Sequence, residues 1–317
     1  MGGEAVPLPL AIVGPTASGK SALALELARR QRDCDTATSS VELLSADSMQ
    51  VYRRMDIGTA KPSAAEQAET RHHLIDLVEP SERFTVVDYA SAFETAMADI
   101  TARGATPMLV GGTGLYLRAV VDGLRPPPEF AEIAAELEAE ATAFGPGDGA
   151  TALHARLAGL DPLAASRMEA TNQRRIVRAL SVCLGTGLPF SSFGPGLSTY
   201  APAPYRFVGI EIDRDELDER IEQRYRHQLE AGFVDEVHGL AGADLSRTAS
   251  QALGYKELLA HVTWECSLDE AIELAVARTR RFARRQQRWF SRDPRITWIP
   301  AGDVSEMADR IGQLQPW

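Results

Sequence analysis

The sequence predicts an α/β protein with a doubly wound parallel sheet and an inserted all-helical lobe. Short apolar, strand-like runs alternate with helical patterns through the first 125 residues, which is typical of a parallel sheet. The alternation stops at three consecutive prolines, residues 126–128, and an alanine-rich helical pattern then continues to about Gly187. We therefore expect a sheet domain made of residues 1–125 and 200–317, and a helical lobe over residues 126–199.

The expected strands are short and buried, and a turn or a helical pattern follows most of them. In such a sheet, ligands bind at the carboxyl ends of the strands. The expected strands lie near residues 11–13, 41–47, 72–77, 106–110, 205–213 and 295–300. Helical patterns begin near Lys20, Thr85, Gly114 and, within the lobe, Asn172.

A glycine turn between the first strand and the first helix carries the best-defined motif. The segment GPTASGKS has the spacing G-x-x-x-x-G-K-[ST] of a phosphate-binding loop. Its backbone N–H groups would hold phosphate oxygens, its lysine would neutralise them, and its serine hydroxyl, that of Ser21, would bind Mg²⁺. The sheet is therefore expected to be P-loop NTPase-like. The motif consists of Gly14, Pro15, Thr16, Ala17, Ser18, Gly19, Lys20 and Ser21.

Polar residues after other strands should lie beside this loop. Asp47 ends the second strand, where a carboxylate could hold Mg²⁺, act as a general base or only cap a helix. Thr113, in GGTGLY, offers a hydroxyl at a helix start, either to a ligand or as a simple N-cap. Arg220 and Arg224 are four residues apart on one helix face, where they could reach an anion or lie on the surface.

Composition and charge exclude several classes of protein. The chain has 317 residues, 44% of them hydrophobic, and a net charge of −11, which disfavours a polyanion-binding surface over the whole molecule. Three widely spaced cysteines, Cys34, Cys183 and Cys266, argue against a disulfide framework or a zinc cluster. No apolar run reaches the roughly 18 residues of a membrane span and no signal-peptide pattern is present, so we expect a cytoplasmic protein without membrane attachment. The missing N-K-x-D motif argues against a GTP-binding switch.

Basic residues are unevenly distributed along the chain. Residues 278–292 contain seven arginines and no acid, so this stretch is either an anion-binding patch or a solvated helix face. Only three of the 33 basic residues are lysines, namely Lys20, Lys61 and Lys256. Because an ammonium and a guanidinium differ in geometry, Lys61 and Lys256 are candidates for specific roles, with chance as the alternative.

Seven segments, taken together and in order, resemble the tRNA isopentenyltransferase family. The resemblance covers nearly the whole chain, is weakest over residues 129–198, and is much more specific than the phosphate loop alone. The connection at residues 33–40 looks longer than is usual in the family, and without a C-terminal zinc finger the chain resembles the bacterial form. The segments are GPTASGKS, SADSMQVYRRMDIGTAKP, HHLID, GGTGLYLRA, RIEQRYRHQLEAGF, QALGYKEL and RRFARRQQRWF.

The resemblance implies a reaction and a role for each candidate residue. In this family the loop holds the diphosphate of dimethylallyl diphosphate, and the prenyl group moves to N6 of the adenine next to the anticodon on its 3′ side, position 37. Mg²⁺, Lys20 and the loop amides would stabilise the leaving diphosphate. By position, the resemblance makes Asp47 the base on the N6 amine. It makes Thr113 the hydroxyl near the bridging oxygen and Arg224 the arginine on the diphosphate.

The resemblance also implies contacts with the tRNA anticodon stem-loop. The target adenine would be flipped out of the loop into the pocket, while the lobe and the arginine-rich helix hold the RNA on either side. No obligate protein partner is expected. The residues implied in tRNA contact are Asp47, Ser48, Met49, Gln50, Thr113, Gln173, Arg174, Arg175, Ile176, Val177, Arg280, Arg284 and Arg288.

Three alternatives stay open at this point. A small-molecule or nucleotide kinase would use the same loop and Mg²⁺ with ATP as donor. A relative that prenylates free adenine nucleotides would need neither the helical lobe nor the arginine-rich stretch. A non-catalytic RNA-binding protein would not need Lys20, Asp47 and Thr113 together.

Overall fold

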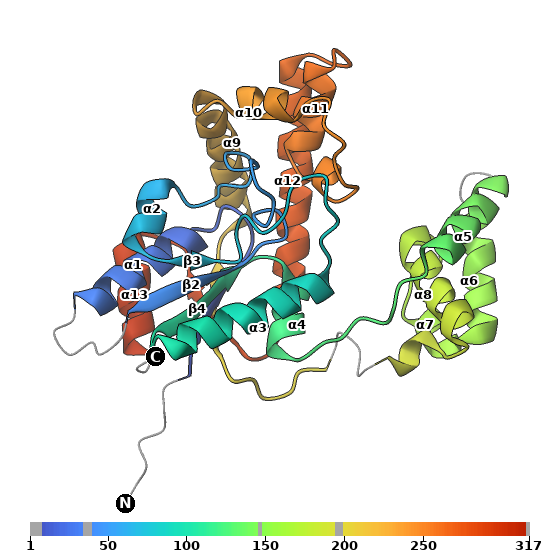
Figure 1. The fold of residues 1–317 in the computed structure, drawn as a ribbon, viewed down its shortest axis with the longest axis horizontal. Coiled ribbons are helices and arrows are strands. Elements are labelled where there is room, and N and C mark those ends of the chain that lie inside the picture. The colour runs from blue at the N-terminus through green and yellow to red at the C-terminus, as the bar shows by residue number, and fades with distance from the viewer. Residues whose placement is uncertain (1–7, 34–39, 145–147, 194–198, 315–317) are drawn as a thin grey trace, which may run out of the picture. The chain divides into compact units, whose positions relative to one another are not determined.

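The structure, a computed structural model, describes residues 8–33, 40–144, 148–193 and 199–314. The chain divides into two compact units. One unit consists of Met1–Gly123 and Tyr200–Trp317 and contains a sheet with its helices; the other is Leu124–Thr199 and is built from helices (Figure 1).

All six strands of the sheet are parallel, in the order β3-β2-β4-β1-β5-β6. The order reverses at β1, which has β4 on one side and β5 on the other, so the carboxyl end of β1 is a topological switch point. Val13 pairs with Gly111, and Gly111 pairs with Ala46, so the loops after β1, β2 and β4 start side by side. The strands are β1 (Leu10–Val13), β2 (Val41–Ala46), β3 (His72–His73), β4 (Thr106–Gly111), β5 (Arg206–Glu211) and β6 (Ile296–Pro300).

Helices cover both faces of the sheet, and β1 shows how its residues divide between them. Leu10 and Ile12 join the apolar cluster formed with α1 and α13, whereas Ala11 and Val13 join the cluster formed with α3 and α4 (Figure 1). The same second cluster continues into α9, α10, α11 and α12. The helices of this unit are α1 (Lys20–Arg32), α2 (Ala64–Glu69), α3 (Val86–Ala102), α4 (Gly114–Val121), α9 (Arg214–Glu230), α10 (Phe233–Leu240), α11 (Tyr255–Val262), α12 (Leu268–Phe290) and α13 (Val304–Gln313), with a 3-10 turn at Ala249–Gln251.

The helical unit has its own apolar core. Leu137, Leu153, Leu157 and Leu180 pack together inside it. Asn172 begins the last long helix by accepting a hydrogen bond from the amide of Arg175, as expected for an N-cap. The elements are α5 (Ala131–Ala143), α6 (Asp148–Leu160), α7 (Pro162–Ser166), α8 (Gln173–Thr186) and a 3-10 turn at Phe190–Ser192.

The expected fold class is confirmed, with differences in single elements. The expected strand at residues 72–77 is only His72–His73, because Leu74 and Asp76 have φ of +66° and +54°, a left-handed backbone that ends a strand. Helix α2 was not expected, although Ser63 and Glu66 form the capping box that starts it.

Two of the three cysteines and the lengths of the helices can be checked in the described residues. Cys183 and Cys266 are free thiols, whereas Cys34 and the rest of residues 34–39 lie outside the described residues. Within the described ranges, no helix is long and apolar enough to span a membrane.

Candidate active site

A cavity of about 410 Å³ lies at the carboxyl ends of β1, β2 and β4. The phosphate loop, the loop after β2 and the turn after β4 form its walls together with α9, α11 and α12. The loop residues that line it are Thr16, Ala17, Gly19, Lys20, Ser21, Asp47, Ser48, Met49, Gln50, Gly58, Thr59, Ala60, Gly111, Gly112 and Thr113. The helices contribute Arg224, Tyr225, Tyr255, Thr279, Phe282, Arg285 and Gln286, among others.

The phosphate loop has the conformation that its glycines predict. Gly14 and Gly19 have φ of +150° and +94°, a range that side chains disfavour. Gly19 is the residue before α1, whose first turn has no side-chain cap among the described residues. The amides at the start of α1 are thus available to an anion. Ser18 is fully buried and supports the loop rather than lining the cavity.

Two partly buried cations, Lys20 and Arg224, line this cavity without an ion-pair partner in the described part of the chain, and the exposed Arg285 lines it as well. Lys20 donates through Nζ to the carbonyl oxygen of Pro15, and burial lowers its pKa to about 8. Arg224 donates from Nη1 to Thr16 Oγ1 at 2.8 Å and from Nη2 to the Gly58 carbonyl oxygen at 3.1 Å, and burial lowers its pKa. Positive charge that is not tied up in an ion pair, next to the amides at the start of α1, is suited to binding a polyanionic group.

Asp47 follows β2 and Thr113 follows β4, at the same edge of the sheet. Asp47 does not cap a helix; its Oδ1 accepts from the amide of Met49 at 2.8 Å and so closes a turn. Thr113 precedes α4, but its hydroxyl does not cap that helix. Instead, Thr113 Oγ1 accepts from the amide of Ser48 at 3.1 Å, which joins the ends of β2 and β4. The Asp47 carboxylate, the Thr113 hydroxyl and Lys20 all line one cavity.

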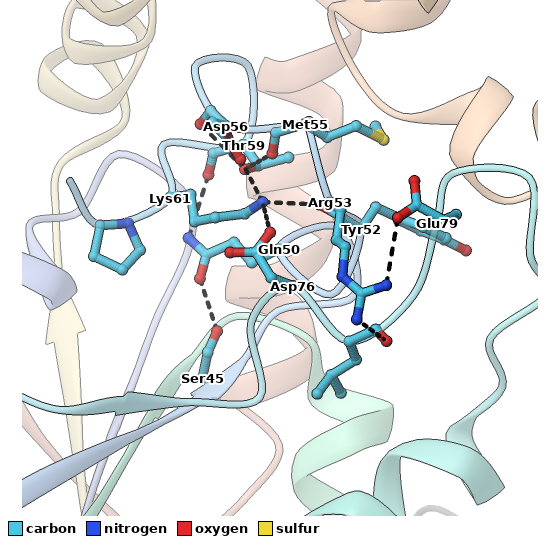
Figure 2. Close-up of polar contacts among 12 residues, drawn as sticks. Ser45, Gln50, Tyr52, Arg53, Met55, Asp56, Thr59, Lys61, Asp76 and Glu79 are labelled. Atoms are coloured by element: carbon cyan, nitrogen blue, oxygen red, sulfur yellow. Dashed lines mark hydrogen bonds and ion pairs between the residues drawn. The ribbon is translucent and has the colours of Figure 1, made fainter. Parts of the chain in front are cut away.

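Gln50 supports the cavity wall from inside the protein. Its Oε1 accepts from Ser45 Oγ at 2.8 Å, and its Nε2 donates to the carbonyl oxygens of Thr59 and Ala60 at 3.4 and 3.1 Å (Figure 2). The side-chain amide of Gln50, implied in tRNA contact, is therefore hydrogen-bonded within the protein, where it holds two other residues that line the cavity.

Sequence reasoning missed Gln286. Its Oε1 accepts from the amide of Thr16 at 2.9 Å and its Nε2 donates to the Gly112 carbonyl oxygen at 2.8 Å, so it ties the phosphate loop to the turn after β4. Gln286 lies on the buried face of α12, where Thr279 is the other polar residue among alanines. Polar residues on a helix face that should be apolar were the available signal.

The arginines of α12 divide between two faces. Arg280 pairs with Glu222 and Asp218, and Arg284 with Asp218 at 2.7 Å, all between α12 and α9. Arg280 and Arg284, which were predicted to contact tRNA together with Arg288, are therefore partly exposed and already paired with acids, and their contact with tRNA stays a prediction. The helical period turns residues 280 and 284 toward the acids of α9. The exposed arginines of this stretch are Arg281, Arg285, Arg288 and Arg292.

Of the residues of the helical unit that were predicted to contact tRNA, some are buried and some are exposed. Ile176 and Val177 belong to the apolar core of that unit, so their side chains are not available to RNA, and the prediction that they contact it is wrong for the side chains. Arg174 and Arg175 are exposed in the first turn of α8, and Gln173 is partly exposed.

The remaining basic candidates have different surroundings. Arg220 pairs at 2.6 Å with Glu216, one turn earlier on the same helix. Lys256 donates to Gln251 Oε1 at 2.8 Å, and Gln251 lines the cavity. Lys61 is buried in a polar cluster that is described below.

Comparison with known proteins identifies the family. A family model described as "IPP transferase" matches residues 50–293. The chain belongs to the IPP transferase family. A Geobacter sulfurreducens relative named tRNA dimethylallyltransferase is 46% identical over 293 residues, which cover 91% of this chain and 90% of that protein. A Kineococcus radiotolerans relative of the same name is 45% identical and covers 100% and 98% of the two chains. The crystal structure of a tRNA isopentenylpyrophosphate transferase from Bacillus halodurans has 36% identity, a TM-score of 0.66 and 96% coverage of both chains.

Proposed function

We propose that this protein is a tRNA dimethylallyltransferase, which moves the dimethylallyl group of dimethylallyl diphosphate to N6 of adenine 37 in tRNA. The observation that carries the proposal is that two partly buried cations without an ion-pair partner, Lys20 and Arg224, line one cavity with the Asp47 carboxylate. Such a cavity offers one wall to a leaving diphosphate and another to an amine that must lose a proton. Relatives named for this reaction match the chain over nearly its whole length.

Each residue of the site has its own role in the proposed reaction. A C–N bond forms between N6 and the first carbon of the prenyl group as the C–O bond to diphosphate breaks. Asp47 accepts the proton that N6 loses, and the Met49 amide holds its carboxylate in place. Lys20, Arg224 and the loop amides stabilise the charge on the departing diphosphate. We assign the Thr113 hydroxyl, which lines the same cavity, to the bridging oxygen of the diphosphate.

The residues present fit a Mg²⁺ ion that is held largely by the substrate. The described residues contain no group of three or more His, Cys, Asp or Glu side chains suited to a metal. Mg²⁺ in phosphate sites is commonly bound by one or two protein oxygens, waters and the phosphates themselves. Ser21, an exposed hydroxyl in the cavity, would supply such an oxygen. When bound, the ion would offset negative charge on the leaving diphosphate.

A comparison of donors and acceptors tests the function. The protein is incubated with undermodified tRNA or AMP and with labelled dimethylallyl diphosphate or ATP, and the products are analysed by nucleoside mass spectrometry. We expect N6-dimethylallyladenosine at position 37 with tRNA and dimethylallyl diphosphate only. Phosphate transfer from ATP would instead support a kinase, and prenylated AMP a nucleotide prenyltransferase. Binding of tRNA without any product would support an RNA-binding protein.

As a tRNA-modifying enzyme, the protein would act in the cytoplasm.

The exposed arginines of α12 provide the second prediction, which concerns RNA binding. Replacing Arg281 and Arg288 by alanine should weaken tRNA binding. The slope of log affinity against log salt should become shallower by about one to two, because fewer counterions are released when the protein makes fewer phosphate contacts. Replacing Arg280 and Arg284 removes the same charge from the same helix but breaks pairs with α9. This matched variant should change the salt slope much less. Equal slope changes in the two variants would show that net charge, not the exposed face, binds the RNA.

The lowered pKa of Lys20 predicts a pH dependence. Only the ammonium form neutralises diphosphate, and burial lowers the pKa of this ammonium to about 8 in the free enzyme. The kcat/KM for dimethylallyl diphosphate should therefore fall as pH rises through about 8. A bound diphosphate favours the charged ammonium, so the fall in kcat should occur at higher pH. A pH profile of both parameters checks this, and Lys20→Arg, whose guanidinium stays protonated, should remove the fall in kcat/KM near pH 8.

A further inference from the structure

Residues 56–60 belong to no helix or strand, and the second half of this segment forms part of the cavity wall. Gly58, Thr59 and Ala60 line the cavity. The carbonyl oxygen of Gly58 accepts a hydrogen bond from Arg224, so the position of this backbone segment also sets the direction of the guanidinium. An irregular segment in such a place needs fixed partners for its backbone groups.

Glu236, in the first turn of α10, is the main partner of that segment. Its Oε2 accepts from the amides of Asp56 and Ile57 at 2.9 and 2.8 Å, and its Oε1 accepts from the amide of Gly58 at 3.2 Å and from the Tyr255 hydroxyl at 2.5 Å. Burial and the nearby Glu236 carboxylate raise the pKa of Tyr255 well above its usual value, so the phenol keeps the proton that it donates. One carboxylate thus holds three successive amides, an arrangement that suits an anion.

The packing around Gly58 leaves no freedom for the segment to shift toward α10 and α11. A Cβ atom on Gly58 would lie 2.4 Å from the rings of both Phe233 and Tyr255. On the α9 side, Gln228 Nε2 donates to the carbonyl oxygens of Ile57 and Gly58 at 2.7 and 3.0 Å. The Gly58 carbonyl therefore sits between Gln228 and Arg224 while Glu236 holds the amides.

Lys61 holds the same segment through the side chain of Asp56. Its ammonium donates to the Tyr52 carbonyl oxygen at 2.8 Å, to Asp76 Oδ1 at 2.6 Å and to Asp56 Oδ1, and its side chain is only 3% exposed (Figure 2). An ammonium has three N–H donors, and three acceptors converge on it here. The planar guanidinium of arginine has a different donor geometry, which gives a physical reason for lysine at this position in an arginine-rich chain.

We propose that Glu236 is a positioning residue for Arg224. By holding the amides of Asp56, Ile57 and Gly58, it fixes the carbonyl oxygen that directs the guanidinium toward Thr16 and the phosphate loop, with Lys61 holding Asp56 as a second anchor. This proposal rests on the proposed role of Arg224 in binding diphosphate.

A double-mutant cycle on pyrophosphate binding tests the proposal. The dissociation constant of inorganic pyrophosphate with Mg²⁺ is measured by calorimetry for the wild type, Glu236→Gln, Arg224→Ala and the double variant. Glu236 accepts from four donors, namely three backbone amides and the Tyr255 hydroxyl. In Glu236→Gln the side-chain NH₂ must face at least one of them, so we expect pyrophosphate binding to weaken about tenfold or more. Arg224→Ala should weaken it about 10- to 100-fold. If Glu236 acts through Arg224, the double variant should match Arg224→Ala within about twofold.

Controls separate positioning from a merely structural effect. Asp235→Asn changes the same charge at the neighbouring, exposed position of α10 and should leave pyrophosphate binding unchanged. If Glu236→Gln fails to fold, Lys61→Met replaces it in the cycle with the same expected lack of additivity. The positioning role would be overturned if the losses of pyrophosphate affinity in the single variants added up in the double variant. It would also be overturned if Glu236→Gln, or Lys61→Met in its place, bound pyrophosphate like the wild type. Undisturbed binding in Arg224→Ala would instead overturn the role of Arg224 itself, a separate result.

Discussion

Lys20→Ala should lower turnover by about three orders of magnitude. In the proposed reaction Lys20 supplies positive charge where the diphosphate departs, and its burial strengthens that electrostatic contact. Removing one preorganised group that stabilises developing negative charge typically costs about 10²–10³-fold in kcat. Single-turnover rates with saturating tRNA and dimethylallyl diphosphate measure the effect on the chemical step.

Arg29→Ala is the matched control for this prediction, because it removes a cation from the same helix. Arg29 pairs with Glu69 on the outside of α1, away from the cavity lining. Its turnover should stay near that of the wild type. ATP should not be consumed in any of these reactions; ATP hydrolysis in proportion to tRNA modification would contradict a diphosphate leaving group at this loop.

Asp47→Asn should lower turnover by about 10²–10⁴-fold, the usual contribution of a general base. The exocyclic amine of adenine is a poor nucleophile because its lone pair is delocalised into the ring. The asparagine side chain of this variant would still offer an oxygen to the Met49 amide, so the turn closed by Asp47 should persist. What the variant lacks is a group that can take the proton from N6. Affinity for the Mg²⁺-diphosphate donor should therefore stay near the wild-type value.

The response to Mg²⁺ distinguishes this role from metal binding. If Asp47 were a ligand of the ion, Asp47→Asn should weaken Mg²⁺-dependent donor binding, and added Mg²⁺ should restore much of the rate. We expect the rate of the variant to be insensitive to added Mg²⁺ above the wild-type optimum. Recovery of the rate would show that Asp47 is a ligand of the metal ion and not the general base.

The sequence by itself determined that the sheet is parallel and doubly wound, and at which edge of it the phosphate loop, Asp47 and Thr113 meet. The phosphate loop is a local motif, since its glycines, lysine and serine act within eight residues at one strand–helix junction. Asp47 and Thr113 were found for a related reason. In a parallel sheet every strand ends at the same edge, so polar residues that follow apolar runs must meet there.

Only the tertiary structure decided which side chains of the later helices take part. A helical pattern shows that Arg280 and Arg281 point in different directions, but not that Asp218 of α9 lies against Arg280. The contacts of Gln286 and Glu236 with backbone amides 270 and 180 residues away in the chain likewise follow no local pattern. Partners across such separations are brought together by the packing of the whole core, because apolar burial fixes how the helices sit on the sheet. The sequence could therefore predict that the phosphate loop, Asp47 and Thr113 meet, and the packing of α9, α10 and α12 decided which groups hold these segments in position.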